Sequence, residues 1–316
     1  MVELVGGGGA SIFILGIAAR SGTNFLWDLL RLHPACAPAR PPITEDYFLY
    51  HADLLAAYTT AVQRSWDPDW GDFPADLGDE LQASLGRSLT SFLQVDPTRR
   101  LLTKTPSVRN LDRFPLLFPG ADLVILVRDG RSVAESCMTT FGWDLETAAR
   151  RWVRAANQIR RFDIANRDRD VRYLIVRYED LLDDLAETMS GMFRFLGLDA
   201  AAYDVQAAEG LPVRGSSVHL GPGRSRVHWE PVPRTPDFDP KERWRGWSVA
   251  WQDRFIWIAD QQLRHFGYDS HPPIPHTRGR AATHRLLDWR WRTSERIQAA
   301  RARFARHDTR VSRARP

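Results

Sequence analysis

Short apolar runs alternate with stretches of helical spacing along most of the chain. The apolar runs predict four buried strands, at residues 11–16, 100–103, 122–127 and 171–176. Apolar positions that recur every three or four residues predict helices over residues 23–32, 77–93, 145–166, 183–196 and 249–265, with a further candidate over 47–61. Because strands alternate with helices, we expect an α/β fold with a central parallel sheet covered by helices on both faces.

The composition divides the chain into three parts. Four glycines in a row make residues 1–10 a flexible leader, because glycine favours neither helix nor strand. Residues 11–276 hold every predicted strand and are expected to form one large domain. Within it, residues 199–240 are rich in Gly, Pro and Ser and predict a long functional loop. Residues 277–316 are expected to form a basic helical tail.

The tail carries the chain's excess of positive charge. Twelve arginines stand there against three acidic residues, a balance of +9, whereas the whole chain has a net charge of +4. Apolar residues are interleaved with these arginines at Leu286, Leu287, Trp289, Trp291, Ile297 and Phe304. This pattern predicts either a basic amphipathic helix that contacts an anionic membrane surface or acidic partner, or a solvated helix that packs on the body through its tryptophans.

Several classes of protein are disfavoured by the composition. No apolar run approaches the length of a membrane span, and the first residues lack the basic region of a secretory signal. Cys36 and Cys137 form no CxxC pair, so we expect no disulfide framework and no metal cluster, and a reducing, cytoplasmic setting. Without zinc-finger spacing, a basic zipper or an RNA-binding aromatic signature, nucleic acid is not an expected partner.

The turn at residues 16–23 is the first candidate for chemistry. It joins the first predicted strand to its helix, where backbone N–H groups and a positive helix end converge on one point and can hold a phosphate. A Walker A loop would place a lysine directly before Thr23, but Gly22 stands there and the cation, Arg20, comes earlier. The alternative is a plain turn in which Thr23 caps the helix.

The second candidate follows the clearest strand, at residues 127–136. A Walker B strand would end in an acidic residue for Mg²⁺, whereas this one ends in Arg128, which suits an anion. Ser132 and Glu135 have the spacing of a capping box, which explains part of the motif. Capping does not explain Arg128, or Ser136 one turn further along the same helix face.

Two further polar residues follow or end predicted strands. Lys104 comes after the strand at 100–103, and Tyr178 lies in Arg177-Tyr-Glu-Asp after the last strand. Ligands of open α/β sheets gather at the carboxyl ends of the strands, so we expect Arg20, Lys104, Arg128 and Tyr178 to lie close together. Each of these residues alone fits a solvated surface charge, and for Arg177 and Glu179 that interpretation is favoured.

Together these motifs resemble the sulfotransferases that use 3′-phosphoadenosine 5′-phosphosulfate (PAPS). Residues 19–23 (ARSGT) resemble their 5′-phosphosulfate loop, and residues 127–136 (VRDGRSVAES) resemble their 3′-phosphate motif. Lys104-Thr-Pro and Arg177-Tyr-Glu-Asp-Leu recur in the same order. Residues 223–227, Trp244 and residues 263–269 are similar to the closing segment of protein-tyrosine sulfotransferases and related bacterial enzymes. The resemblance implies a P-loop-like three-layer fold.

The resemblance also implies a role for each matching residue. The 5′-phosphate is held by the loop, at Ser21, Gly22, Thr23 and Asn24. The 3′-phosphate is bound by Arg128 and Ser136, Tyr178 lies near the nucleotide, and Ser225 and Arg226 close over it. Arg20 and Lys104 neutralise the charge on the transferred sulfuryl oxygens, as oriented cations do in phosphoryl transfer.

The implied reaction moves a sulfuryl group to a hydroxyl acceptor without a metal and leaves adenosine 3′,5′-bisphosphate (PAP). The hydroxyl acceptors open to such an enzyme are glycans, lipids, peptide tyrosines and secondary metabolites. One alternative is a P-loop nucleotide kinase or NTPase, which the absent Walker lysine and Walker B acid disfavour. The other is a nucleotide-binding module without catalytic activity.

The general base is where the sequence departs from the family pattern. Many small-molecule sulfotransferases have a catalytic histidine after the Lys-Thr pair, but Pro106 follows here. Protein-tyrosine sulfotransferases use a glutamate after the first helix, and Glu45 is the nearest equivalent. The alternative interpretation is a solvated acidic pair of Glu45 and Asp46, and His51 competes as the base.

Overall fold

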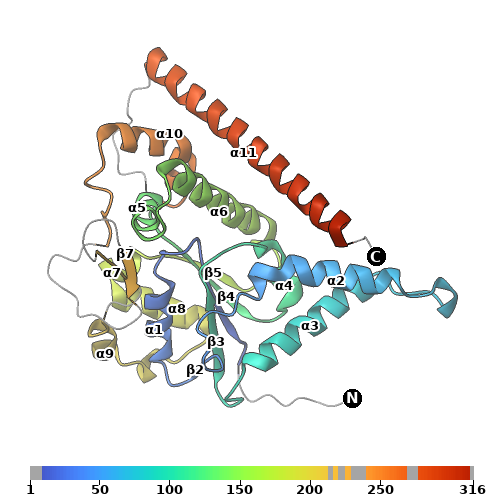
Figure 1. The fold of residues 1–316 in the computed structure, drawn as a ribbon. Coiled ribbons are helices and arrows are strands. Elements are labelled where there is room, and N and C mark those ends of the chain that lie inside the picture. Colours follow the sequence, from blue (N-terminus) through green and yellow to red (C-terminus); the bar gives the residue numbers. More distant parts are fainter. Residues whose placement is uncertain (1–8, 213–215, 220–224, 229–239, 269–276, 314–316) are drawn as a thin grey trace.

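A computed structural model describes residues 9–212, 216–219, 225–228, 240–268 and 277–313, with backbone alone in 216–219, 225–228 and 298–313 (Figure 1). Its centre is a five-stranded sheet in the order β2-β3-β1-β4-β5, with every neighbouring pair parallel. The strands are β1 (Ile12–Gly16), β2 (Cys36–Pro38), β3 (Arg100–Thr105), β4 (Asp122–Val127) and β5 (Tyr173–Arg177).

Helices cover both faces of this sheet, which confirms the predicted three-layer α/β architecture. The α-helices are α1 (Thr23–Arg31), α2 (Ala52–Arg64), α3 (Leu77–Leu93), α4 (Phe114–Leu117), α5 (Gly130–Phe141), α6 (Leu145–Asn166), α7 (Asp180–Asp183), α8 (Leu185–Leu196), α9 (Val205–Glu209), α10 (Val249–His265) and α11 (Arg278–Arg313). Figure 1 shows the sheet with α1 and α8 on one side and α4 on the other.

The alternation of β1 explains how the two layers are built. Successive strand residues point to opposite faces, so Phe13 and Leu15 enter one core with α4, α5, α6 and α10. Ile12 and Ile14 enter the other core with the apolar residues of α1 and α8. All four side chains are almost fully buried. A strand that is apolar on both faces in this way is typical of a covered parallel sheet.

Several regular elements follow the sequence prediction closely. The predicted bounds of β4, α3, α6 and α10 are confirmed to the residue. The side chain of Asp144 caps α6, and that of Ser248 caps α10. No helix in the described part of the chain is long and apolar enough to cross a membrane.

Some elements were not predicted. The three-residue β2 is too short to show a pattern, and the antiparallel pair β6 (Ser216–His219) and β7 (Ser225–His228) lies within the stretch predicted to be a loop. The candidate helix over 47–61 starts as a 3₁₀ turn, Leu49–His51, and continues as α2. β5 begins two residues later than predicted.

Candidate active site

The candidate site lies at the carboxyl edge of the sheet, around the loop that joins β1 to α1. β1 is the middle strand, with β3 on one side and β4 on the other. From β1 the chain goes to β2 and β3 on one side and then crosses to β4 on the other. This edge is therefore the switch point at which open α/β sheets bind ligands. Lys104 stands at the end of β3, Arg128 directly after β4 and Tyr178 directly after β5.

Two glycines give the loop its shape. A Cβ atom on Gly16 would stand 2.4 Å from Ser21 Oγ and 2.6 Å from Thr23 Cγ2, so a side chain there would disrupt the turn. Gly22 has a φ of +98°, and a Cβ atom there would stand 2.4 Å from the ring of Tyr178. The loop therefore needs glycine at both positions, and Tyr178 packs directly against it.

The start of α1 is open to an anion. Gly22 is its N-cap residue and no side chain caps the helix, so the interpretation in which Thr23 caps a plain turn is wrong. The first N–H groups of a helix have no acceptor within the helix, and they carry a partial positive charge. Beside them Ser21 Oγ is buried and has no hydrogen-bond partner. Asn24 is half-buried in the same first turn.

Three arginines gather next to this loop, and two of them contact Ser136. Arg20 Nε donates to Ser136 Oγ at 3.0 Å, and Arg243 Nη1 lies 3.3 Å from the same oxygen. Arg128 Nη1 donates to the Arg20 carbonyl at 2.8 Å. Burial, together with the charges of Arg243 and Arg128, lowers the pKa of Arg20 to about 10. Burial and the charge of Arg128 also lower the pKa of Arg243. Such mutual repulsion is relieved when an anion binds among the cations.

Arg128 also holds the chain that returns over the site. Its guanidinium lies over the Tyr178 ring, 4.6 Å from the centroid, and its Nη2 donates to the Pro240 carbonyl at 2.5 Å. The Nε of Arg128 is buried without a partner. Ser132 Oγ donates to the Lys241 carbonyl. These bonds bring Arg243 to the site.

Arg243 is the functional candidate that the sequence analysis missed. It lies between Lys241 and Trp244, after a long irregular stretch. Its distance along the sequence from the other motifs therefore does not indicate that it lies near them in the fold. The available signal was its place directly before Trp244, within the segment similar to that of other sulfotransferases. Its partner Ser136 is 107 positions away, and only the fold reveals this contact.

A separate ion pair joins Lys104, which lies in β3, to Glu45, which lies in the segment after β2. Lys104 is 3% exposed and lies within the strand, not after it as predicted. Its Nζ is 3.2 Å from Glu45 Oε1, and the Tyr47 hydroxyl donates to Glu45 Oε2 at 2.5 Å. Burial lowers the pKa of Lys104, and Glu45 partly opposes that effect.

Backbone contacts fix Glu45 at this position. The N–H of Asp46 donates to the Lys104 carbonyl at 3.1 Å, and the N–H of Tyr47 donates to Thr105 Oγ1 at 3.0 Å. Tyr47 has a φ of +53°, a strained conformation for a residue with a side chain. The segment 45–47 is therefore pinned against the end of β3, with the Glu45 carboxylate held between a cation and a hydroxyl donor.

The two alternatives to Glu45 as the base, Asp46 and His51, are not held beside Lys104 in this way. Asp46 is buried, where it accepts from Thr103 Oγ1 and from the Phe48 N–H, both at 2.8 Å. Burial raises its pKa. The interpretation of Glu45 and Asp46 as a solvated acidic pair is therefore wrong. His51 is exposed, packs edge-on against Tyr50, and makes no hydrogen bond to Lys104 or Glu45 in the described structure.

Two further sequence interpretations are corrected here. Glu179 is not a solvated surface charge: it is buried and accepts from the Asp129 N–H at 3.0 Å and from the Tyr268 hydroxyl at 2.8 Å. The capping box of α5 is also wrong, because Asp129 caps that helix. Glu135 instead accepts from the Trp247 indole at 2.6 Å.

Part of the predicted site stays a prediction. Ser225 and Arg226 lie in β7, of which only the backbone is described. Residues 220–224 and 269 of the closing segment lie outside the described residues. Among the described residues, no group of three or more His, Cys, Asp or Glu side chains is arranged to hold a metal ion.

The comparison with known families decides the identity of the chain. The profile of the sulfotransferase family matches residues 11–202, which include the loop, Lys104, Arg128 and Tyr178. The chain belongs to the sulfotransferase family. No curated protein matches this sulfotransferase.

Solved structures agree with the fold. The sulfotransferase domain of the Synechococcus olefin synthase has a TM-score of 0.50 and 23% identity, over 83% of this chain and 95% of its own. A Mycobacterium avium sulfotransferase has a TM-score of 0.47 and 16% identity, over 82% and 77%. A mouse sulfotransferase solved with PAP has a TM-score of 0.42 and 12% identity, over 81% and 84%. The parallel sheet and the similarity to the olefin synthase domain agree with the sulfotransferase fold expected from the sequence.

Proposed function

We propose that this sulfotransferase moves a sulfuryl group from PAPS to a hydroxyl acceptor, giving a sulfate ester and PAP. Family membership supports sulfuryl transfer, and one observation carries the choice of donor. Arg20 and Arg243 both contact Ser136, beside an uncapped helix start. Arg128 lies next to them and donates to the Arg20 carbonyl. The start of α1 and the arginine cluster are two adjoining positive centres. They suit a nucleotide with phosphate groups at both its 5′ and 3′ positions.

The residues present fit such a donor. The buried, unpartnered Ser21 Oγ and Arg128 Nε are hydrogen-bonding atoms that a ligand would satisfy. The 5′-phosphate would lie against the loop at Ser21, Gly22 and Thr23, and the 3′-phosphate against Arg128 and Ser136, with Arg243 added to the set predicted from sequence. When bound, PAPS supplies a sulfuryl group on a good phosphate leaving group.

Glu45 and the two cations would act on the acceptor. As the acceptor oxygen bonds to sulfur and the bond from sulfur to the phosphate oxygen breaks, the hydroxyl proton must leave, and a Glu45 carboxylate oxygen is placed to take it. Lys104, held 3.2 Å from that carboxylate, and Arg20 would stabilise the negative charge on the sulfuryl and bridging oxygens. The Tyr47 hydroxyl orients the base.

The alternative functions have less support. A nucleotide kinase or NTPase would place an acidic residue where β4 ends, but Arg128 stands there and contacts the loop. A binding module without activity would not require the strained segment that holds a carboxylate beside a buried lysine, because nucleotide binding needs no general base. A cytoplasmic location, supported by the free thiols of Cys36 and Cys137, belongs to the same proposal.

The test compares the full chain with Arg128→Ala. By calorimetry, PAP should bind the wild-type chain at least about tenfold more tightly than AMP, because a charge-assisted contact to phosphate contributes about 1.5–3 kcal/mol. Arg128→Ala should lose most of that preference and change AMP affinity little. Equal losses for PAP and AMP would contradict the assignment of the 3′-phosphate site.

Turnover tests the reaction itself. With PAPS and a panel of alcohols, phenols, glycans and tyrosine peptides, we expect PAP release that depends on one acceptor class and persists in excess EDTA. Hydrolysis of ATP that strictly requires Mg²⁺, with no PAP release from PAPS, would favour the kinase alternative instead.

A further inference from the structure

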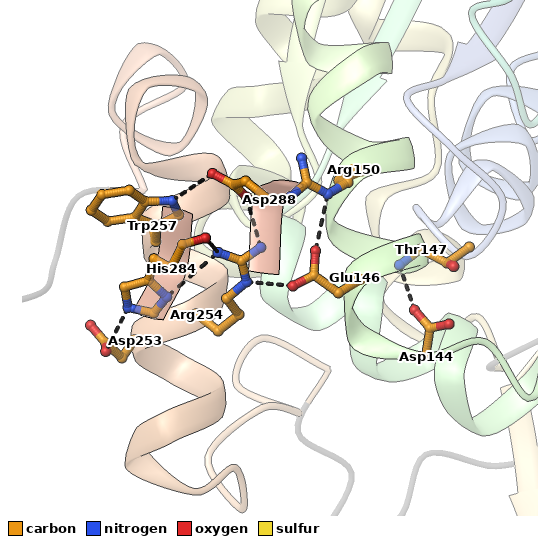
Figure 2. A network of polar contacts seen from close by, with 9 residues as sticks. All are labelled: Asp144, Glu146, Thr147, Arg150, Asp253, Arg254, Trp257, His284 and Asp288. Carbon is orange, nitrogen blue, oxygen red and sulfur yellow. Dashed lines mark hydrogen bonds and ion pairs between the residues drawn. The ribbon is translucent and has the colours of Figure 1, made fainter. Parts of the chain in front are cut away.

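The carboxy-terminal helix α11 has one face that is bound to the body. Figure 2 shows the contacts: Arg254 of α10 donates to Asp288 of α11 at 2.7 Å and forms an ion pair with Glu146 of α6. Asp288 also pairs with Arg150 at 2.5 Å, and the Trp257 indole donates to it at 3.0 Å. The first turns of α11 are therefore fixed to both α6 and α10.

A buried histidine extends this inner face. His284 is 5% exposed, and its Nε2 lies 3.0 Å from Asp253 Oδ2. Asp253 is also paired with Arg280, at the start of α11. Its burial opposes ionisation, but the bonds from Arg280 and His284 prevail and lower its pKa. The tail thus packs on the body through charged groups and through Trp291, whose ring centroid lies 5.4 Å from the Arg150 guanidinium. The other predicted tryptophan contact is absent from the described part of the chain, because Trp289 is exposed.

The outer face of α11 is apolar and exposed. Leu286, Trp289 and Ile297 are 57%, 62% and 48% exposed, respectively. At 100° per residue these three positions fall on one side of the helix, roughly opposite His284 and Asp288. Large apolar side chains that share one exposed face of a helix indicate an interaction surface.

The charge around this stripe indicates what it contacts. Arg290 on one flank and Arg285 and Arg296 on the other are all exposed. The tail as a whole has a balance of +9, while the rest of the chain is net negative. An apolar stripe with tryptophan, flanked by arginines, is complementary to an anionic lipid surface: the rings and aliphatic chains enter the interface, and the long guanidinium side chains reach the headgroups.

We propose that the outer face of α11, formed by Leu286, Trp289 and Ile297 with flanking Arg285, Arg290 and Arg296, docks this sulfotransferase on an anionic lipid surface. The helix lies in the plane of the interface and does not cross it. Because the inner face is fixed to α6 and α10, docking places the whole enzyme body at the surface, not on a loose tether. This proposal does not depend on the donor or acceptor assignments.

The experiment uses the full chain and lipid vesicles. The chain should co-sediment with vesicles of equal parts phosphatidylglycerol and phosphatidylcholine and not with pure phosphatidylcholine vesicles. The double variant Trp289→Ser, Ile297→Ser should bind at least about tenfold more weakly, because it removes the apolar burial. The matched control is Trp70→Ser, Val95→Ser, two residues of comparable exposure elsewhere, at 70% and 50%. It should bind as the wild type does.

A second arm tests the charges. Arg290→Gln, Arg296→Gln should also weaken binding to anionic vesicles, and raising the salt concentration should weaken the wild type toward that variant. All substituted side chains are exposed, so thermal unfolding should match the wild type and any loss of binding is not a loss of fold.

Three outcomes would overturn the proposal. The first is that wild-type chain does not bind anionic vesicles. The second is that the Trp289 and Trp70 double variants lose binding equally, which would mean unspecific adhesion. The third is found by sedimentation velocity without lipid: a wild-type dimer that becomes monomeric in the Trp289 double variant would make a second copy of the chain the occupant of this face.

Discussion

The Lys104 ammonium lies 3.2 Å from a carboxylate oxygen of Glu45, although 59 positions separate the two residues in the chain. Lys104 is held in β3, and Glu45 reaches it because the segment after β2 runs back across the carboxyl edge of the sheet. Buried lysines are costly unless paired, and this one is paired with a half-buried carboxylate at the carboxyl edge of the sheet. Such a pair is more readily explained by catalysis than by stability.

The first prediction is that Glu45→Gln abolishes most turnover. Glutamine keeps the shape of the side chain and removes its basicity, and a positioned general base contributes about 10²–10⁴-fold. We expect kcat to fall at least about a hundredfold, with PAP affinity close to wild type. The control is His51→Asn, which should keep most of its activity. An inactive His51→Asn together with an active Glu45→Gln would make His51 the base.

The second prediction concerns the alkaline limb of the pH–rate profile. Lys104 must be charged to stabilise the sulfuryl oxygens, so activity is present below its folded-state pKa and is lost as pH rises through it. Because burial lowers that pKa, the loss should begin below the ordinary lysine value of 10.5. Lys104→Arg, whose guanidinium stays charged, should move the limb to higher pH while lowering kcat. An unmoved limb would assign it to another group.

Site residues could be predicted from the sequence where their positions follow from local pattern, and not where they depend on contacts between distant parts of the chain. The loop, Arg128 and Tyr178 follow strands directly, so the sheet edge that gathers them was predictable from local pattern. Arg243 and Glu179 were not, because Arg243 meets a residue 107 positions away and Glu179 one 50 positions away. Ser132 fits a capping pattern locally, yet Asp129 takes the cap because its carboxylate reaches the Arg131 N–H at the helix start.

The third prediction tests Arg243 against a neighbour. Arg243→Ala should weaken PAP binding at least about tenfold, since a charge-assisted contact is lost. Arg245→Ala is the matched control, because its side chain is 71% exposed and pairs only with nearby Glu242 in the described structure. It should leave PAP affinity unchanged. Calorimetry of both variants at one salt concentration is the measurement, and similar losses in the two would mean a general effect of charge.

The last prediction concerns the stability that α11 contributes. Deleting residues 277–316 removes Asp288 and His284, two of the partners of Arg254, whose side chain is 6% exposed in the intact chain. Glu146 is the partner of Arg254 that remains. The lost hydrogen bonds to charged groups contribute about 1.5–3 kcal/mol each, so urea unfolding should show a lower free energy of unfolding. Deleting only residues 298–316 keeps the network and should leave the free energy of unfolding nearly unchanged. PAP affinity, measured on folded protein, should be close to wild type in both truncations, because no contact of the described tail involves the arginine cluster. If the long truncation were as stable as the wild type, the network in Figure 2 would not be what holds the helix to the body.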